Sequence, residues 1–341
     1  QGGSVLGVGC SDPYSSSLNG SQSRLGPRSE VNATTGVFTY PYQLQWQRTG
    51  NQIFKRLQVK REDINPAQNA GALYFVEGHY ITQDDHAAGN ALNNASYRRV
   101  TVSNNATFSV SNASGSTTQR TKPAIWAWKD HGLGLNQSDP AVEIKTVDVP
   151  GDGRFFVGSK VTDLGNGMWR YEYAVFNLTS HRSGAGVEIP AAAGVNVTNI
   201  GFRDVDYHSG EPYDNTDWTM TRAGGTVAWD SPQTYAQNVN TNALRWSTMY
   251  NFRFDADVPP VSGQGTLRLF RPGTPDTVSF SIPVPSTPSC PSDWDQSGGV
   301  DGDDITAFFG DWQAGTADID GSGGTDGDDI GAFFVFWQAG C

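Results

Sequence analysis

A segment of twelve residues, rich in Asp and Gly, occurs twice near the C-terminus, at 293–304 and again 25 residues later at 318–329. Both copies have oxygen-bearing side chains at positions 1, 3, 5, 9 and 12, and Gly at position 6. A calcium loop has this spacing, because the hard cation needs six or more oxygen ligands and the sixth residue must turn sharply. The expected ligands are Asp293, Asp295, Ser297, Asp301 and Asp304 in the first loop and Asp318, Asp320, Ser322, Asp326 and Asp329 in the second, with the position-7 carbonyls of Gly299 and Gly324. We therefore expect two Ca²⁺ ions, one in each loop.

A helical pattern of apolar residues follows each loop. Residues at i, i+3, i+4 and i+7 share one face of a helix. These positions hold Ile305, Phe308, Phe309 and Trp312 after the first loop and Ile330, Phe333, Phe334 and Trp337 after the second. The sequence therefore predicts two amphipathic helices that pack on each other. The alternative, a disordered acidic tail, would lack large apolar residues in such phase.

Acidic charge is concentrated in the same region. The chain of 341 residues has a formal charge of −12, and residues 291–341 contain eleven Asp and no Glu, Lys, Arg or His. Subtracting these eleven from the 35 acidic residues leaves 24 against 23 basic ones, a charge of −1 for the rest. This change predicts a domain boundary, and the proline-spaced stretch Ile282–Ser289 predicts a short stiff linker before a C-terminal module at 290–341. A chain this acidic lacks the clustered Lys and Arg of a nucleic-acid binder, and it has no apolar run long enough to span a membrane.

Residues 290–341 resemble the dockerin module, a pair of loop–helix calcium repeats found at the C-termini of secreted bacterial proteins. The resemblance lies in the spacing, the Asp at position 12 and the duplication, and the flanking Cys290 and Cys341 resemble a variant on planctomycete surface proteins. In cellulosome dockerins, positions 10 and 11 help select the cohesin partner. Here they are Gly302-Asp303 and Gly327-Asp328, unlike the usual Ser-Thr type pair, which speaks against a standard cohesin partner. The remainder of the chain resembles only uncharacterised secreted β-proteins.

Residues 36–285 show a period of two. Trp169, Tyr171, Tyr173 and Val175 alternate with smaller or charged residues, which predicts a strand with one aromatic face. Further strands are expected at 37–47, 52–60, 73–77, 99–102, 107–110, 142–149, 155–162, 197–202, 244–254, 266–270 and 277–282. Many short strands without crossover helices predict a mainly β fold, an antiparallel β-sandwich or jelly roll, built as one sandwich or two. Residues 1–35, rich in Gly, Ser and Asn, are expected to form an extended arm.

No motif of a known catalytic centre occurs in the body. The best candidate is Asp204, Asp206 and His208, which would project on one face of a strand and could hold a metal or transfer protons. We favour a hydrated strand edge there, and a plain polar loop for Asp84-Asp85-His86. Alternation would place Trp126 and Trp128 on one face, where they would line a sugar platform or, more commonly, a core.

Several features favour export. The chain begins at Gln1 without a signal peptide, so a mature, processed product is expected. A disulfide between Cys290 and Cys341 is expected to join the ends of the acidic segment, which leaves Cys10 as a buried thiol or a link to another chain. Eight N-x-Ser/Thr sequons predict a glycosylated surface, at Asn19, Asn32, Asn94, Asn105, Asn112, Asn136, Asn177 and Asn196.

These features support two hypotheses of function. The first is a secreted, non-enzymatic structural subunit of a fibre, filament or surface layer, which binds copies of itself or a cell-surface scaffold. A chain with an arm at one end and a docking module at the other makes heterologous contacts, and these propagate into filaments unless they close into rings. The alternative is a carbohydrate-binding or carbohydrate-active protein anchored by its dockerin-like module, an analogy that rests on fold alone.

Overall fold

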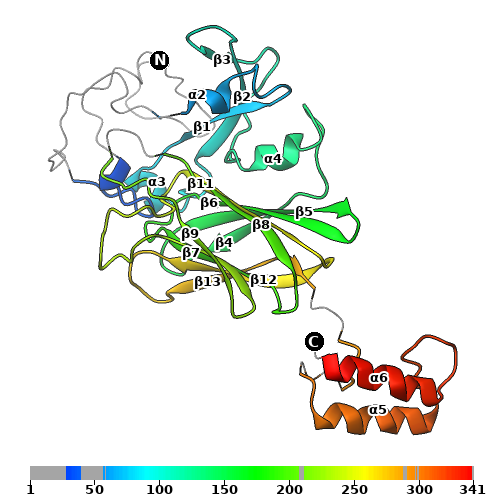
Figure 1. Ribbon diagram of the computed structural model, residues 1–341. Helices are drawn as coiled ribbons and strands as arrows, with labels where there is room; N and C mark the ends of the chain where they lie inside the picture. The colour runs from blue at the N-terminus through cyan, green and yellow to red at the C-terminus, as the bar shows by residue number, and fades with distance from the viewer. Residues whose placement is uncertain are drawn as a thin grey trace, which may run out of the picture. The chain divides into compact units, whose positions relative to one another are not determined.

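The computed structural model describes residues 28–39, 57, 59–206, 211–286, 290–295, 297 and 299–339. Over these residues the fold is mainly β and its sheets are antiparallel, as the alternation predicted, and the described strands form three sheets. Two compact units can be distinguished, one containing the three-stranded sheet and the other containing both five-stranded sheets and the C-terminal helices (Figure 1). None of the described helices is long and apolar enough to cross a bilayer.

The first unit is built around the sheet β1-β2-β3, formed by β1 (Tyr74–His79), β2 (Ala95–Val102) and β3 (Val110–Asn112). Its short helical segments are η1 (Arg28–Glu30), α2 (Arg61–Ile64) and α3 (Gln83–Ala87). The guanidinium of Arg28 donates to both carboxylate oxygens of Glu211, at 2.7 and 2.9 Å, which joins the first described residues to the second segment of this unit.

Strand predictions in this unit are confirmed in part. The strands expected at 73–77 and 99–102 lie within or largely within β1 and β2, whereas 107–110 meets β3 only at Val110. The strands expected at 37–47 and 52–60 are wrong where they can be checked, because residues 37–39, 57, 59 and 60 do not belong to a strand. The other positions of these two predictions lie outside the described residues.

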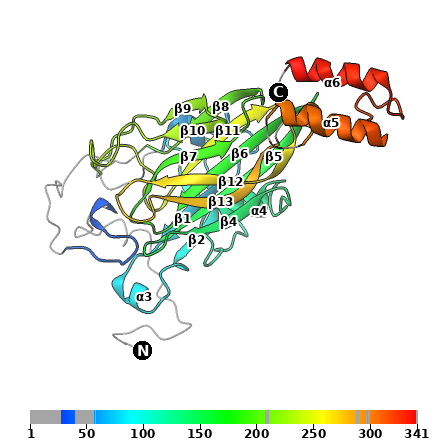
Figure 2. The same cartoon turned by 90° about the horizontal axis from the view of Figure 1, so that it is seen from below.

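The second unit contains one sandwich, shown as two layers in Figures 1 and 2. One sheet has the order β13-β12-β7-β10-β9 and the other β4-β5-β6-β11-β8. The bounds are β4 (Glu143–Asp148), β5 (Arg154–Gly165), β6 (Met168–Asn177), β7 (Gly184–Pro190), β8 (Val197–Arg203), β9 (Thr219–Ala223), β10 (Thr226–Asp230), β11 (Thr248–Ala256), β12 (Pro260–Leu269) and β13 (Thr277–Pro285). After the meander β4-β5-β6 the chain crosses between the sheets five times, so both layers depend on strands distant in sequence.

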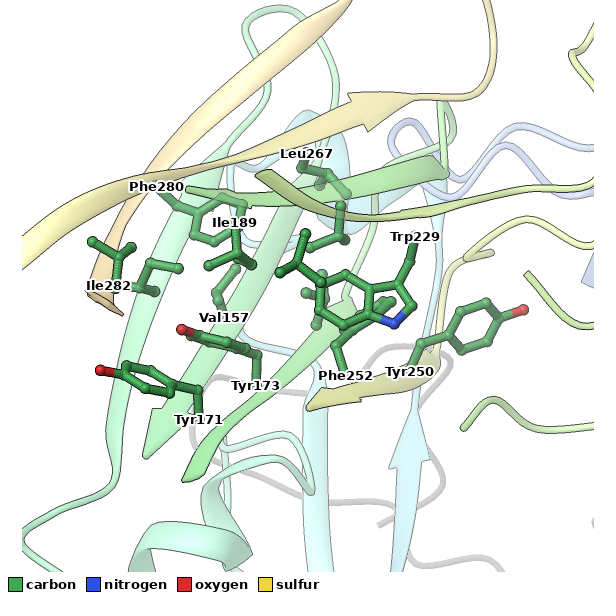
Figure 3. Packing of buried hydrophobic residues seen from close by; sticks show 14 of the residues in the cluster. Val157, Tyr171, Tyr173, Ile189, Trp229, Tyr250, Phe252, Leu267, Phe280 and Ile282 are labelled. Carbon is green, nitrogen blue, oxygen red and sulfur yellow. The ribbon is translucent and has the colours of Figure 1, made fainter. Parts of the chain in front are cut away.

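Apolar side chains of both sheets meet in one buried cluster (Figure 3). On β6, Tyr171, Tyr173 and Val175 are at most 2% exposed, which confirms the predicted aromatic face. The two hydroxyl groups are satisfied, because Tyr171 donates to the carbonyl of Val258 at 2.9 Å and Tyr173 to that of Pro283 at 2.8 Å. Each such residue contributes on the order of 2 kcal/mol by burial, and together they hold the layers in register.

A short helix, α4 (Trp126–His131), stands where alternation was expected for the tryptophan pair. Residues 126–128 are helical rather than extended, so Trp126 and Trp128 do not share a face by alternation. The ring of Trp126 packs edge-on against Phe156 at 6.4 Å, and a Cβ at Gly158 would lie 3.1 Å from the Trp128 ring. Both tryptophans therefore pack toward β5 and do not form a flat exposed platform.

The stretch predicted as a linker begins later than expected. Residues 282–285 belong to β13, where Pro283 and Pro285 pair with Ser262 and Pro260 of β12. Proline is tolerated there because β13 is an edge strand, which has no second neighbour requiring its N–H groups. Of the predicted linker only Ser286 follows the strand within the described residues, and 287–289 lie outside them.

The C-terminal region forms two helices, α5 (Gly302–Ala314) and α6 (Gly327–Ala339), which lie side by side in Figures 1 and 2. Both helices and their packing on each other agree with the predicted apolar stripes. Phe308, Phe333 and Ala317 are fully buried between them, surrounded by partly buried members of both stripes.

Candidate metal centre

The predicted loops bring carboxylates together at three positions each. One carboxylate oxygen from each of the residues at positions 1, 3 and 12 lies within 4.8 Å of the other two in both loops. The groups are Asp293, Asp295 and Asp304 in the first loop, and Asp318, Asp320 and Asp329 in the second. Asp301 and Asp326, at position 9, do not belong to these groups of three.

In the first loop, the fully buried Asp304 organises the backbone. Its Oδ1 accepts the N–H of Asp295 at 3.1 Å, and its Oδ2 accepts that of Asp301 at 2.8 Å, which also caps the start of α5. Burial alone would raise the pKa of Asp304. The hydrogen bonds from the N–H groups of Asp301 and Asp295 together have a larger effect than burial, so the pKa of Asp304 lies below its ordinary value. The carboxylate is therefore anionic, and its remaining lone pairs are available to a cation.

The second loop repeats this arrangement around Asp329, which is also fully buried. Its Oδ2 accepts the N–H of Asp326 at 2.8 Å, and its Oδ1 accepts those of Ile319 and Asp320 at 2.9 and 3.2 Å. The Asp326 hydrogen bond is the main cause that lowers the pKa of Asp329 below its ordinary value. The two loops therefore share one internal design.

The glycine at position 6, which is expected to turn each loop, is among the described residues in the second loop. Gly323 has a φ of +94°, a backbone conformation that residues with a side chain rarely adopt. Its N–H donates to Oδ2 of Asp318 at 2.9 Å. Its counterpart Gly298 lies outside the described residues. Ser297 and Ser322 donate their N–H groups to Asp295 and Asp320 at 2.9 Å, which holds position 3 of each loop.

The donor set fits a hard divalent cation. All the converging side chains are carboxylates, and neither group includes the nitrogen or sulfur ligands that zinc prefers. Positions 1, 3 and 12 would hold Ca²⁺ in each loop, with Ser297, Ser322 and the position-7 carbonyls of Gly299 and Gly324 close in sequence to complete a shell. The remaining predicted ligands, Asp301 and Asp326, cap the helices: each accepts the N–H of the residue two positions on, at 2.8 Å.

The tryptophans of the apolar stripes connect each helix to the opposite loop. Nε1 of Trp312 in α5 donates to the carbonyl of Asp326 at 2.7 Å, and Nε1 of Trp337 in α6 donates to that of Asp301 at 3.3 Å. A third indole, Trp294, bonds within its own repeat, to Oδ2 of Asp311 at 2.9 Å. The stripes predicted packing, but not these hydrogen bonds.

The two repeats differ on the surface of their helices. Over 13 residues α5 and α6 differ at only three positions, of which two are Gly310-Asp311 in α5 and Val335-Phe336 in α6. Val335 is 67% exposed and Phe336 39% exposed. An adjacent pair of exposed apolar residues in α6 therefore stands where the nearly identical helix α5 has Gly and Asp. A comparison of the repeats within the sequence could have found it.

The other acidic candidates have structural partners. Residues 204–206 are not a strand, because β8 ends at Arg203, so the expected common face does not form. Asp204 accepts a hydrogen bond from Asn242, and Asp206 lies 3.5 Å from Nζ of Lys60. His208 lies outside the described residues. Asp84, Asp85 and His86, expected in a loop, form part of helix α3 instead, where Asp85 accepts a hydrogen bond from Asn94.

The described sequons differ in exposure. Asn177 is fully buried: its amide donates to the carbonyls of Ser180 and Leu244 at 3.0 Å, and its oxygen accepts the Ser180 N–H at 2.8 Å. A glycan on this nitrogen would break those bonds, so this sequon is closed in the folded chain. Exposed positions are Asn105, Asn112, Asn136 and Asn196, while Asn32 and Asn94 are half-buried and Asn19 lies outside the described residues.

Of the three cysteines, Cys290 is disulfide-bonded. Cys10 and Cys341 lie outside the described residues, as does most of the predicted arm. The pairing of Cys290 with Cys341 therefore stays a prediction.

Comparisons with known proteins do not assign the chain to a family. No family model and no curated protein matches the sequence. Among solved structures, it is similar to the KRT10-binding region domain of the pneumococcal serine rich repeat protein PsrP, with 10% identity and a TM-score of 0.23. That match covers 42% of this chain and 96% of the other. A likeness this remote carries no argument about function.

Proposed function

We propose that the protein is a secreted, glycosylated structural subunit of an extracellular assembly, a fibre or surface layer. Its C-terminal module (residues 290–341) binds two Ca²⁺ ions and docks on another copy of the chain or on a cell-surface scaffold. No catalytic role is part of this proposal.

The observation that carries the docking role is the exposed pair Val335 and Phe336. The sister helix, with Gly310 and Asp311 at these positions, demonstrates that the fold of a repeat does not need apolar residues there. Exposed apolar side chains that the fold does not require favour a contact with a partner.

Charge supports the calcium part of the proposal. Residues 291–341 carry −11, and two bound Ca²⁺ ions would reduce this to −7. Without cations, the converging carboxylates of each loop repel one another within 4.8 Å. Calcium would therefore stabilise the module in the form that presents Val335 and Phe336.

The decisive experiment converts α6 into the surface of α5. The variant V335G/F336D introduces the residues that the sister helix already holds, so we expect it to bind calcium and remain folded. Negative-stain microscopy and mass photometry should show assemblies for the parent chain in calcium and monomers for the variant. T306G is the matched control: it makes α5 resemble α6 at the third differing position, costs about 0.3 kcal/mol of helix propensity, and should leave assembly intact.

Two results would overturn the proposal. Assemblies of V335G/F336D indistinguishable from the parent would remove the docking role of the pair. Monomers of the parent at every calcium concentration, or assemblies that persist after deletion of 290–341, would remove the role of the whole module. The carbohydrate hypothesis receives no support from Trp126 and Trp128, which pack toward β5.

A further inference from the structure

We infer that Trp312 and Trp337 couple the two cation loops, so that an ion bound in one loop raises the affinity of the other. This inference rests on the calcium binding proposed above. It concerns how the affinities of two sites on one module depend on each other. Trp312 and Trp337 act as positioning residues through their indole N–H groups.

The first connection runs from the second loop to the first helix. The N–H of Asp326 donates to the position-12 carboxylate of Asp329, and the carbonyl of the same residue accepts the indole of Trp312. Trp312 belongs to α5, whose N-terminal turn contains Asp304, the position-12 carboxylate of the first loop. A cation at either carboxylate therefore acts on the same hydrogen-bonded path.

The second connection is the counterpart of the first. The N–H of Asp301 donates to Asp304 and its carbonyl accepts the indole of Trp337 in α6. Both tryptophans and both acceptors are separated by the repeat length of 25 residues. Each repeat thus donates to the loop of the other, so the helix of one repeat is joined to the loop of the other.

The coupling follows from repulsion in the unliganded loops. When a loop lacks its cation, its carboxylates favour an open conformation, which moves the position-9 carbonyl away from the indole that donates to it. A cation in one loop restores the acceptor, fixes the opposite helix, and removes part of the ordering cost of the second binding event. Coupling of this kind is typically about fivefold or more.

The test is a double-mutant cycle on the full chain. Calcium is removed with a chelator, and Ca²⁺ is titrated by calorimetry into the parent and into D318N/D320N, in which the second loop is disabled. We expect loop-1 affinity to fall about fivefold when the second loop is disabled. In the W312F/W337F background, which retains aromatic rings but lacks the two N–H donors, the same loop-2 change should alter loop-1 affinity less than about twofold.

Trp294→Phe is the matched control. It also removes one indole hydrogen bond from the module, but that bond joins Trp294 to Asp311 in the same repeat. The fivefold coupling should therefore survive in W294F. Trp337→Phe alone removes only the longer connection and should give an intermediate value, which decides the question if the double variant fails to fold.

The outcomes separate the two proposals. If the parent binds no Ca²⁺ at millimolar concentration, the proposed function fails. If the parent binds two ions with no coupling, or if W312F/W337F and W337F both keep the parental coupling, calcium binding stands and the role of the tryptophans is refuted.

Discussion

Phe308 and Phe333 stack with their ring centroids 4.2 Å apart and their planes 12° from parallel. They occupy the same position in the two repeats and are both fully buried, so the centre of the module is a contact between equivalent residues. Trp294 packs edge-on against this pair, with its ring 5.1 Å from that of Phe308. The interior of the module is therefore aromatic, while its loops are acidic.

Truncating this contact should unfold the module at lower denaturant concentration. Phe308→Ala removes a fully buried ring and should cost about 3–5 kcal/mol of module stability. Urea unfolding followed by tryptophan fluorescence in calcium measures the change. Phe336→Ala, at a 39% exposed position of α6, should cost less than about 1 kcal/mol. Equal losses in the two variants would contradict this assignment of the core.

Chelation should unfold the module and leave the sandwich folded. The converging carboxylates of each loop need a counter-charge, whereas the sandwich is held by a buried apolar cluster. Hydrogen exchange with and without chelator should show loss of protection in α5 and α6 and unchanged protection in β6 and β11. Equal protection of α5 and α6 in both conditions would refute the prediction.

Acid should weaken the sandwich through Asp255. Arg170 donates to both oxygens of this buried carboxylate at 2.8 and 3.1 Å, and these bonds lower the pKa of Asp255 more than its burial raises it. A carboxylate whose pKa is lowered by folding stabilises the fold at pH values above its ordinary pKa of about 4. This stabilisation is lost as the pH falls through the pKa of the folded state. D255N should lower stability by about 1–2 kcal/mol at pH 7, and the difference should shrink toward pH 2.

The control for Asp255 is an exposed pair on the edge of the same sheet. Arg154 donates to Asp148 at 2.7 Å, but the Asp148 side chain is 61% exposed. Because exposed ion pairs contribute little, D148N should cost less than about 1 kcal/mol. Urea titrations at pH 7 and below pH 3 provide both comparisons, and a pH-independent cost of D255N would be inconsistent with the titration argument.

Glycosylation should spare Asn177. Its amide nitrogen donates two hydrogen bonds inside the sandwich, whereas Asn105, Asn112, Asn136 and Asn196 are exposed. Mass spectrometry of glycopeptides from the native protein should find glycans on some of the exposed sites and none on Asn177. A substantial occupied fraction at Asn177 would contradict this part of the fold.

Sequence alternation predicted the strands whose two faces differ strongly. On β6 and β11 large aromatic residues point into the core at every second position, so their signal is clear. It missed β7, where Gly184, Ala185 and Gly186 are all buried but are too small to give an alternating apolar signal. The β9–β10 hairpin was missed too, although Gly224 and Gly225, with φ of +58° and +77°, form the two-residue turn between its strands.

The candidate site was more predictable than the body of the chain. Ligand spacing within one loop is local, so the convergence of Asp318, Asp320 and Asp329 could be expected from sequence. The bonds from Trp312 and Trp337 to the opposite loops depend on how α5 and α6 pack, which spacing along one helix does not specify. The predicted stripe does not include Val335 and Phe336, so it did not predict that this apolar pair is exposed.

The end of β13 determines how the sandwich would bear mechanical tension. This strand pairs with β12 over nine positions, from Thr277 to Pro285, and the Tyr173 hydroxyl holds the carbonyl of Pro283 from the facing sheet. A pull transmitted from the C-terminal module enters the sandwich at Pro285. When directed along the strand, it loads the whole ladder in shear, so many hydrogen bonds must fail together. A subunit joined to its neighbour in this way would resist stretching through its last strand, and the Tyr173 bond would act as a cross-layer anchor for that load.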